Sequence, residues 1–114
     1  MELFNVTNAK SDDLWIVKEF FNSICRHGRF IRVIAQLVNH ESSVINEEYC
    51  LFSEPAGGDP ELDFIGVKFG NPSGEIVISE ESLNNFIDEA CKEYLAHYPN
   101  EAANIGEILL SRRI

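Results

Sequence analysis

The sequence predicts a single α+β domain over residues 1–114, with a helix pair, a three-stranded antiparallel meander and a C-terminal helix pair in chain order. Apolar residues recur at three- and four-residue steps in the first and last parts of the chain, as they do on amphipathic helices. Between these parts, short apolar runs alternate with glycine and proline, which is typical of strands joined by turns. A chain of 114 residues can bury one core without a disulfide or a metal.

The first helix pair is predicted from apolar spacing and from start and stop signals. Ser11 suits an N-cap and Gly28 suits a C-terminal stop, so a helix is expected at about residues 12–27. The dense apolar run at 30–39 fits both a helix and a buried strand, and its spacing around Arg32 favours a helix. The inward stripe of the first helix consists of Leu14, Trp15, Val17, Phe20, Phe21, Ile24 and Cys25.

The central part of the chain predicts the meander. Residues 41–43 and Asn46 are expected in a loop, and the Pro- and Gly-rich segments 54–60 and 71–74 are expected to be turns. Short connections of this kind join antiparallel strands. Gly66, inside a strand pattern, predicts a bulge or a close backbone contact. The three expected strands are residues 48–53, 62–69 and 75–78.

The second helix pair follows directly. Either Ser79 or Ser82 can cap the first of these helices, and Tyr98 with Pro99 is expected to end it. A last helix is expected from about Glu101 to the basic pair 112–113, since cations suit a helix C-terminus. The inward stripe of the first of these two helices is Leu83, Phe86, Ile87, Ala90, Cys91, Tyr94 and Leu95.

Composition excludes several classes of partner. A formal net charge of −10 disfavours binding to nucleic acid and to anionic membrane surfaces, and it favours a cationic partner. No apolar run approaches the roughly 20 residues that span a bilayer, and the first residues lack a signal-peptide pattern. The three widely spaced cysteines, Cys25, Cys50 and Cys91, are expected to be buried thiols, so we expect a cytoplasmic protein.

No residue pattern predicts a catalytic or metal site, and no cofactor is expected. Cys25 and His27 are two residues apart on a helix, so they face different directions and do not make a nucleophile–base pair. His40 and His97 lack the closely spaced partner ligands that a zinc site needs. The nineteen acidic residues leave open accidental carboxylate pairs, so a small carboxylate-dependent hydrolase stays an alternative.

The distribution of charge is more informative than any motif. No Lys or Arg occurs between Val33 and Val67, whereas seven acidic residues do. One interpretation is a solvated face that only confers solubility. The other is an anionic surface that docks on a basic protein, because complementary charge accelerates association. On the second interpretation the candidate partner-binding residues are Glu47, Glu48, Glu54, Asp59, Glu61 and Asp63, which could gather along one rim of the sheet.

Four segments of the sequence resemble the immunity proteins of contact-dependent growth inhibition systems, in particular those paired with ribonuclease toxins. The segments are residues 18–25, 48–52, 64–70 and 78–99, and most of their distinctive residues are core positions.

The resemblance implies a cytoplasmic, non-enzymatic antidote that binds a basic nuclease toxin domain as a monomer in a 1:1 complex and covers its active site. Because binding surfaces vary greatly among such proteins, it assigns no site residue. An acidic interaction or regulatory domain with another partner is the alternative.

Overall fold

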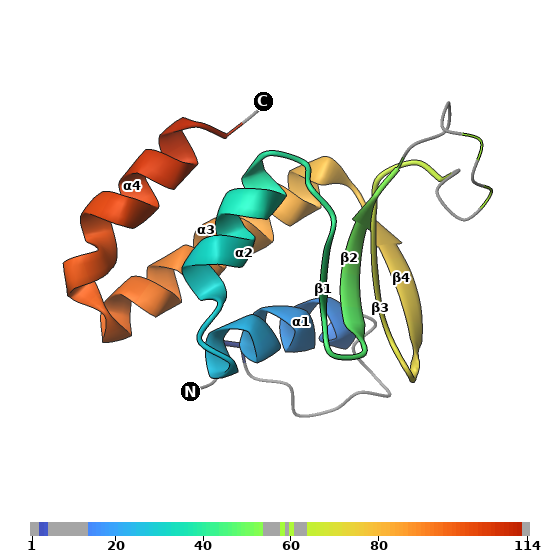
Figure 1. Cartoon of the computed structure of the whole chain (residues 1–114), viewed down its shortest axis with the longest axis horizontal. Helices are drawn as coiled ribbons and strands as arrows, with labels where there is room; N and C mark the ends of the chain where they lie inside the picture. Colours follow the sequence, from blue (N-terminus) through green and yellow to red (C-terminus); the bar gives the residue numbers. More distant parts are fainter. Residues whose placement is uncertain (1–2, 5–13, 54–57, 59, 61–63, 113–114) are drawn as a thin grey trace.

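A four-stranded antiparallel sheet stands at one side of the molecule, and the helices lie on the other side (Figure 1). The computed structural model describes residues 3–4, 14–53, 58, 60 and 64–112. Within these residues the helices are α1 (Trp15–Arg26), α2 (Phe30–Val38), α3 (Glu80–His97), the 3-10 helix η3 (Pro99–Glu101) and α4 (Ala102–Leu110). The strands are β1 (Ser43–Ile45), β2 (Glu48–Phe52), β3 (Val67–Asn71) and β4 (Gly74–Ile78). The predicted α+β class is therefore confirmed.

The sheet has one strand more than the sequence predicted. The strands follow one another in the order β1-β2-β3-β4, each antiparallel to the next. The predicted loop included Ser43, and this prediction is wrong, because Ser43 is the first residue of β1. Three residues are too few for a period of two to be recognised in a sequence. In the structure Ser43 and Ile45 are buried whereas Val44 is exposed, as the alternation of a strand requires.

The strand predicted at 62–69 begins later and ends later than expected. Bends occupy Phe64–Gly66, β3 starts at Val67, and residues 61–63 lie outside the described part of the chain. The predicted close backbone contact at Gly66 is confirmed: its φ is +113°, and a Cβ there would lie 2.3 Å from the carbonyl oxygen of Ile78. The predicted turn is reduced to Pro72 and Ser73. The backbone amide of Ser73 donates a hydrogen bond to the side-chain oxygen of Asn71 at 2.8 Å.

The first helix pair forms as the spacing predicted. α1 starts at Trp15 with Leu14 at its N-cap, so it begins later than the predicted residue 12, and Ser11, the expected cap, lies outside the described residues. Gly28, with φ +69°, follows the helix and ends it as expected. The run that fitted either a helix or a strand is the helix α2, and its Phe30 stacks on Tyr94 of α3 at 4.2 Å between ring centroids.

The C-terminal helices also start and stop near the predicted residues. The Ser79 hydroxyl oxygen accepts a hydrogen bond from the Ser82 amide at 3.0 Å, so Ser79 is the cap of α3. α3 ends at His97, η3 separates it from α4, and α4 ends at Leu110, slightly before the expected basic end. Arg112 pairs with Asp88 of α3 at 2.8 Å and thereby fastens the end of α4 to the domain.

The hydrophobic core lies between the helices and the inner face of the sheet. Phe69 of β3 lies 5.3 Å from Phe20 and 6.2 Å from Phe21 of α1, measured between ring centroids. The fully buried Asn22 of α1 accepts hydrogen bonds from the backbone amides of Leu3 and Phe4 at 2.8 and 2.9 Å. These bonds hold a segment near the start of the chain against the core, with no buried polar atom of Asn22 left unpaired.

The cysteines are free thiols in the structure. Cys50 and Cys91 are buried, as predicted, whereas Cys25 is only half-buried. Burial raises the pKa of the Cys91 thiol to about 12 and also raises the pKa of Cys50. Within the described residues, every helix is too short or too polar to cross a membrane.

We predict that Gly66→Ala lowers the free energy of unfolding by about 1–3 kcal/mol, because alanine is strained at this φ. The new methyl group would also overlap the Ile78 carbonyl oxygen. Gly106→Ala in α4 is the matched control, since a Cβ there meets nothing within 4 Å and should raise stability by about 0.5–1 kcal/mol. Urea unfolding followed by circular dichroism measures both; equal effects of the two substitutions would contradict the assignment of strain.

Candidate functional site

Two of the six predicted binding acids lie side by side in the structure. Glu47 is in the β1–β2 turn and Glu48 is the first residue of β2. The other four, Glu54, Asp59, Glu61 and Asp63, lie outside the described residues. The chain leaves β2 at Phe52, at the opposite end of that strand from Glu48. The rim of six acids therefore stays a prediction, and its described part is the turn that carries Glu47.

Glu48 differs from an ordinary surface acid. Its side chain lies on the helix-facing side of the sheet, because it alternates with the buried residues Cys50 and Phe52. The hydroxyl of Ser23, a buried residue of α1, donates a hydrogen bond to the Glu48 Oε2. The Oε1 atom is buried and has no hydrogen-bond partner among the described residues. Glu48 therefore joins β2 to α1.

The position of Glu48 changes its acidity. Burial disfavours the carboxylate and raises the pKa of Glu48 above its ordinary value of 4.5. The hydrogen bond from Ser23 lowers the pKa, the charge of Glu19 raises it, and Arg26 and His27 lower it. The effects that raise the pKa outweigh those that lower it. The ionised form of Glu48 therefore lowers the stability of the folded protein.

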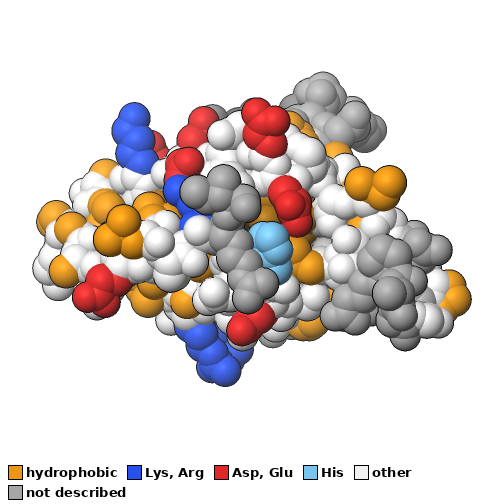
Figure 2. Space-filling model, turned by 90° about the horizontal axis from the view of Figure 1, so that it is seen from above, with side chains coloured by type: hydrophobic (Ala, Val, Ile, Leu, Met, Phe, Trp, Pro, Cys, Tyr) orange, Lys and Arg blue, Asp and Glu red, His pale blue; other side chains and the backbone are white. Residues whose placement is uncertain are grey.

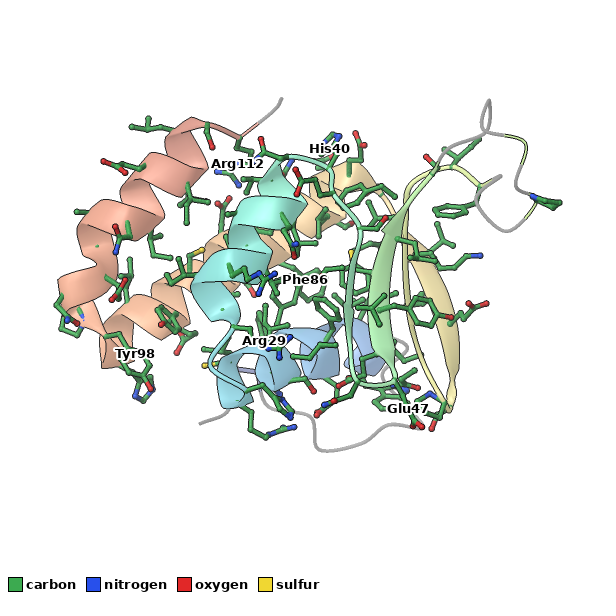
Figure 3. All side chains as sticks on the ribbon, in the orientation of Figure 1. Arg29, His40, Glu47, Phe86, Tyr98 and Arg112 are labelled. Carbon is green, nitrogen blue, oxygen red and sulfur yellow. The ribbon has the colours of Figure 1, made fainter. Side chains whose placement is uncertain are left out.

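An open depression of about 720 Å³ surrounds these two acids, and we call it the acidic hollow. It lies where α1 meets the β1–β2 and β3–β4 turns; Figure 3 shows Glu47 at this end of the sheet, beside α1. Three carboxylates face a single arginine there, and Arg26 is paired with Glu19 at 3.1 Å. The lining residues are Trp15, Glu19, Ser23, Arg26, His27, Asn46, Glu47, Glu48, Asn71, Pro72 and Ser73.

A histidine fastens the β1–β2 turn to α1 at the edge of the hollow. His27 Nδ1 lies 2.8 Å from the Ser23 carbonyl oxygen, and its Nε2 lies 3.2 Å from the Asn46 amide nitrogen. A neutral imidazole protonated on Nδ1 satisfies both contacts, because Nε2 then accepts from the amide. Asn46 adopts a positive φ of 55°, which asparagine tolerates. His27 is the C-cap residue of α1.

The sequence contained a signal for the α1 side of the hollow that the prediction did not use. Glu19, Ser23 and Arg26 are spaced by four and three residues, so they share one face of a helix. This polar stripe lies beside the apolar stripe of the helix. It indicates a contact with something polar, which the structure identifies as Glu48.

On the face seen in Figure 2, most of the described acidic side chains stand apart from one another, as on a solvated surface. No group of three or more His, Cys, Asp or Glu residues in the described part of the chain is placed to hold a metal ion. The hollow offers carboxylate oxygens, which accept hydrogen bonds from arginine and lysine side chains.

The sheet, the helices behind it and the hollow define the chain as a small acidic α+β domain whose charged recess is open to a partner. The chain belongs to the CDI immunity protein family, whose model matches residues 13–109. The resemblance to immunity proteins of contact-dependent growth inhibition is thereby confirmed. Membership supports an immunity role against a CDI toxin and hence binding to a cognate toxin protein. No curated protein shows significant similarity to the chain.

We predict that Glu48→Gln removes a pH dependence of stability. With the pKa of Glu48 raised in the folded state, the wild type loses stability as the pH rises above about 4.5 and through the folded pKa. Glutamine carries no charge, so its stability relative to the wild type should increase with pH over this window and then level off. Urea unfolding at pH values from 4 to 8 measures the difference.

Ser23→Ala provides the matching variant for this experiment. It removes the hydrogen bond that lowers the pKa of Glu48, so its loss of stability with rising pH should exceed that of the wild type. A constant difference between Glu48→Gln and the wild type at every pH would refute the assigned role of Glu48.

Proposed function

We propose that the protein is a non-enzymatic immunity protein that neutralises the nuclease domain of a CDI toxin, most directly a ribonuclease, by covering its active site. It acts in the cytoplasm as a monomer in a 1:1 complex. The observation that carries the proposal is the acidic hollow, in which Glu19, Glu47 and Glu48 surround a recess open to a partner. Family membership supplies the toxin as that partner.

The chemistry of a nuclease explains why an acidic surface is suited to it. A ribonuclease holds the phosphates of its substrate with arginine and lysine side chains, which carry most of the binding energy. Carboxylates compete for the same cations and accept bidentate hydrogen bonds from arginine. A protein with a net charge of −10 is also attracted over a distance to a basic domain, which raises the association rate.

The three acids of the hollow have different parts in this proposal. Glu47 is exposed and stands in a turn, so it is available to a partner without a conformational change. Glu19 is engaged with Arg26, and both are partly exposed, so a toxin arginine can compete with this pair. Glu48 is held against α1 by Ser23 and supports the position of the turn.

We predict that one equivalent of the protein stops RNA cleavage by the purified toxin domain encoded with it. The inhibition curve should break at a 1:1 ratio, because one domain covers one active site. Cleavage of RNA and of DNA is measured with and without the protein, so that the substrate of the nuclease is identified in the same experiment. A bound toxin that still cleaves its substrate would contradict coverage of the active site.

We further predict that Glu47→Lys slows association with the toxin domain several-fold and reduces the dependence of the association rate on salt. Exposed charges at an interface act mainly on association. Glu107→Lys on α4 is the control, since Glu107 is also an exposed acid and α4 lies away from the sheet (Figure 1). Stopped-flow or surface plasmon resonance at several salt concentrations gives the rates. Equal rates for the two variants would exclude the hollow from the interface.

A further inference from the structure

The outward face of the sheet is unusually apolar for a surface. The helices lie on the other side of the sheet (Figure 1), and an antiparallel sheet with one open face normally carries polar residues there. In this protein Val44 is 64% exposed and Val77 43% exposed on that side. Tyr49 and Leu51 lie between them and are half-buried. We call these four side chains the outer platform.

The strand register shows that the outer platform is continuous. One row across the sheet pairs Val44 with Tyr49, Tyr49 with Gly70 and Gly70 with Glu75. The next row pairs Leu51 with Lys68 and Lys68 with Val77. Side chains that share a row and a face are neighbours. The platform residues come from β1, β2 and β4, and Lys68 and Glu75 are their charged neighbours on the same face.

Tyr49 is held flat at the centre of the platform. A Cβ at position 70 would lie only 2.2 Å from the Cζ atom of Tyr49, so the glycine is what allows the ring to lie across β3. The hydroxyl of Tyr49 then reaches β4 and donates to Glu75. Beside the ring is a depression of about 470 Å³, lined by Val44, Tyr49, Leu51, Lys68 and Glu75.

The apolar surface continues beyond the platform. The Lys68 ammonium lies 4.7 Å from the centroid of the Phe64 ring, and the next residue, Ile65, is 96% exposed. A second depression, of about 570 Å³, is lined in part by Phe64, Ile65 and Val77. Contiguous exposed apolar surface on a small protein marks an interaction site, and tyrosine is enriched at the energetic centres of interfaces.

We infer that the outer platform is the surface on which the cognate toxin domain docks, with Tyr49 as its anchor and the turn at Glu47 as its charged rim. The two features are joined by the β1–β2 hairpin, because Val44 and Tyr49 flank the turn that carries Glu47. The inference rests on the proposed function and identifies the surface that performs it. Apolar contact there would contribute most of the affinity, whereas the acids would increase the association rate.

The net charge of the chain favours a basic toxin domain, rather than a second copy of this chain, as the partner on the platform. Each copy carries a net charge of −10, so pairing two copies brings like charges together. Glu75 beside the platform and Glu47 at its edge are both exposed, and a two-fold contact would bring these acids of both copies into one interface. A basic partner with apolar side chains on its contact surface meets no such repulsion.

Val44→Asp and Val77→Asp test the platform, each compared with Leu110→Asp on α4. All three replace an exposed aliphatic residue by the same charge, and Leu110 is 89% exposed. We expect each platform variant to raise the Kd for the purified toxin domain at least tenfold, chiefly through faster dissociation, and the Leu110 variant to stay within twofold of wild type. Circular dichroism checks the fold. Val77→Thr, which keeps the β-branched shape, is the second variant if aspartate perturbs the sheet, with a several-fold increase expected.

The outcomes separate the platform from the immunity role. If the wild type binds the toxin domain and all platform variants bind equally well, the platform is not the docking surface and the immunity role stands. If the folded wild type fails to bind the toxin domain, both proposals fall. Sedimentation of the wild type alone completes the test: a dimer that Val44→Asp dissociates would make a second copy the occupant and overturn the inference.

Discussion

The packing of α1 against β3 is the contact on which the rest of the structure depends. Phe20 and Phe21 are consecutive in the sequence, and the rings of both lie near Phe69 of β3, at 5.3 and 6.2 Å between centroids. Burial of each phenylalanine contributes about 1.5–3 kcal/mol. The contact determines which face of the sheet is covered, and it therefore also determines which face is left to solvent.

The same packing explains the raised pKa of Glu48. Glu48 lies on the same face of β2 as Cys50 and Phe52, at the end of the strand. The Ser23 hydroxyl of α1 is within hydrogen-bonding distance of its carboxylate there. A carboxylate is thus held beneath a helix, with one oxygen bonded and the other buried without a described partner. Such an arrangement costs stability, and residues that are costly to the fold are often retained for a function. Here it fixes the turn that presents Glu47.

Much of the fold was predictable from the sequence, whereas the site was predictable only in part. Long amphipathic helices have a periodicity that a sequence displays, and so α1, α2 and α3 were expected close to their observed bounds. β1 has only three residues and gives no such pattern. The charge pattern of the sequence grouped Glu48 with exposed acids, although Glu48 and Cys50 are two residues apart and so lie on the same face of β2. The reason is that β2 is apolar on both faces, so its alternation does not reveal which face α1 covers.

That ambiguity has a functional side. A strand that is apolar on both faces can make apolar contacts on both, and within the described residues α1 supplies the helix contact on one of them. The uncovered face carries Tyr49 in a fixed orientation, since Gly70 leaves room for the ring and Glu75 accepts from its hydroxyl. A rigid aromatic group loses little conformational entropy when it is buried by a partner, which favours tight binding. The acidic charge accelerates association with a basic protein, and apolar contact with the outward face slows its dissociation.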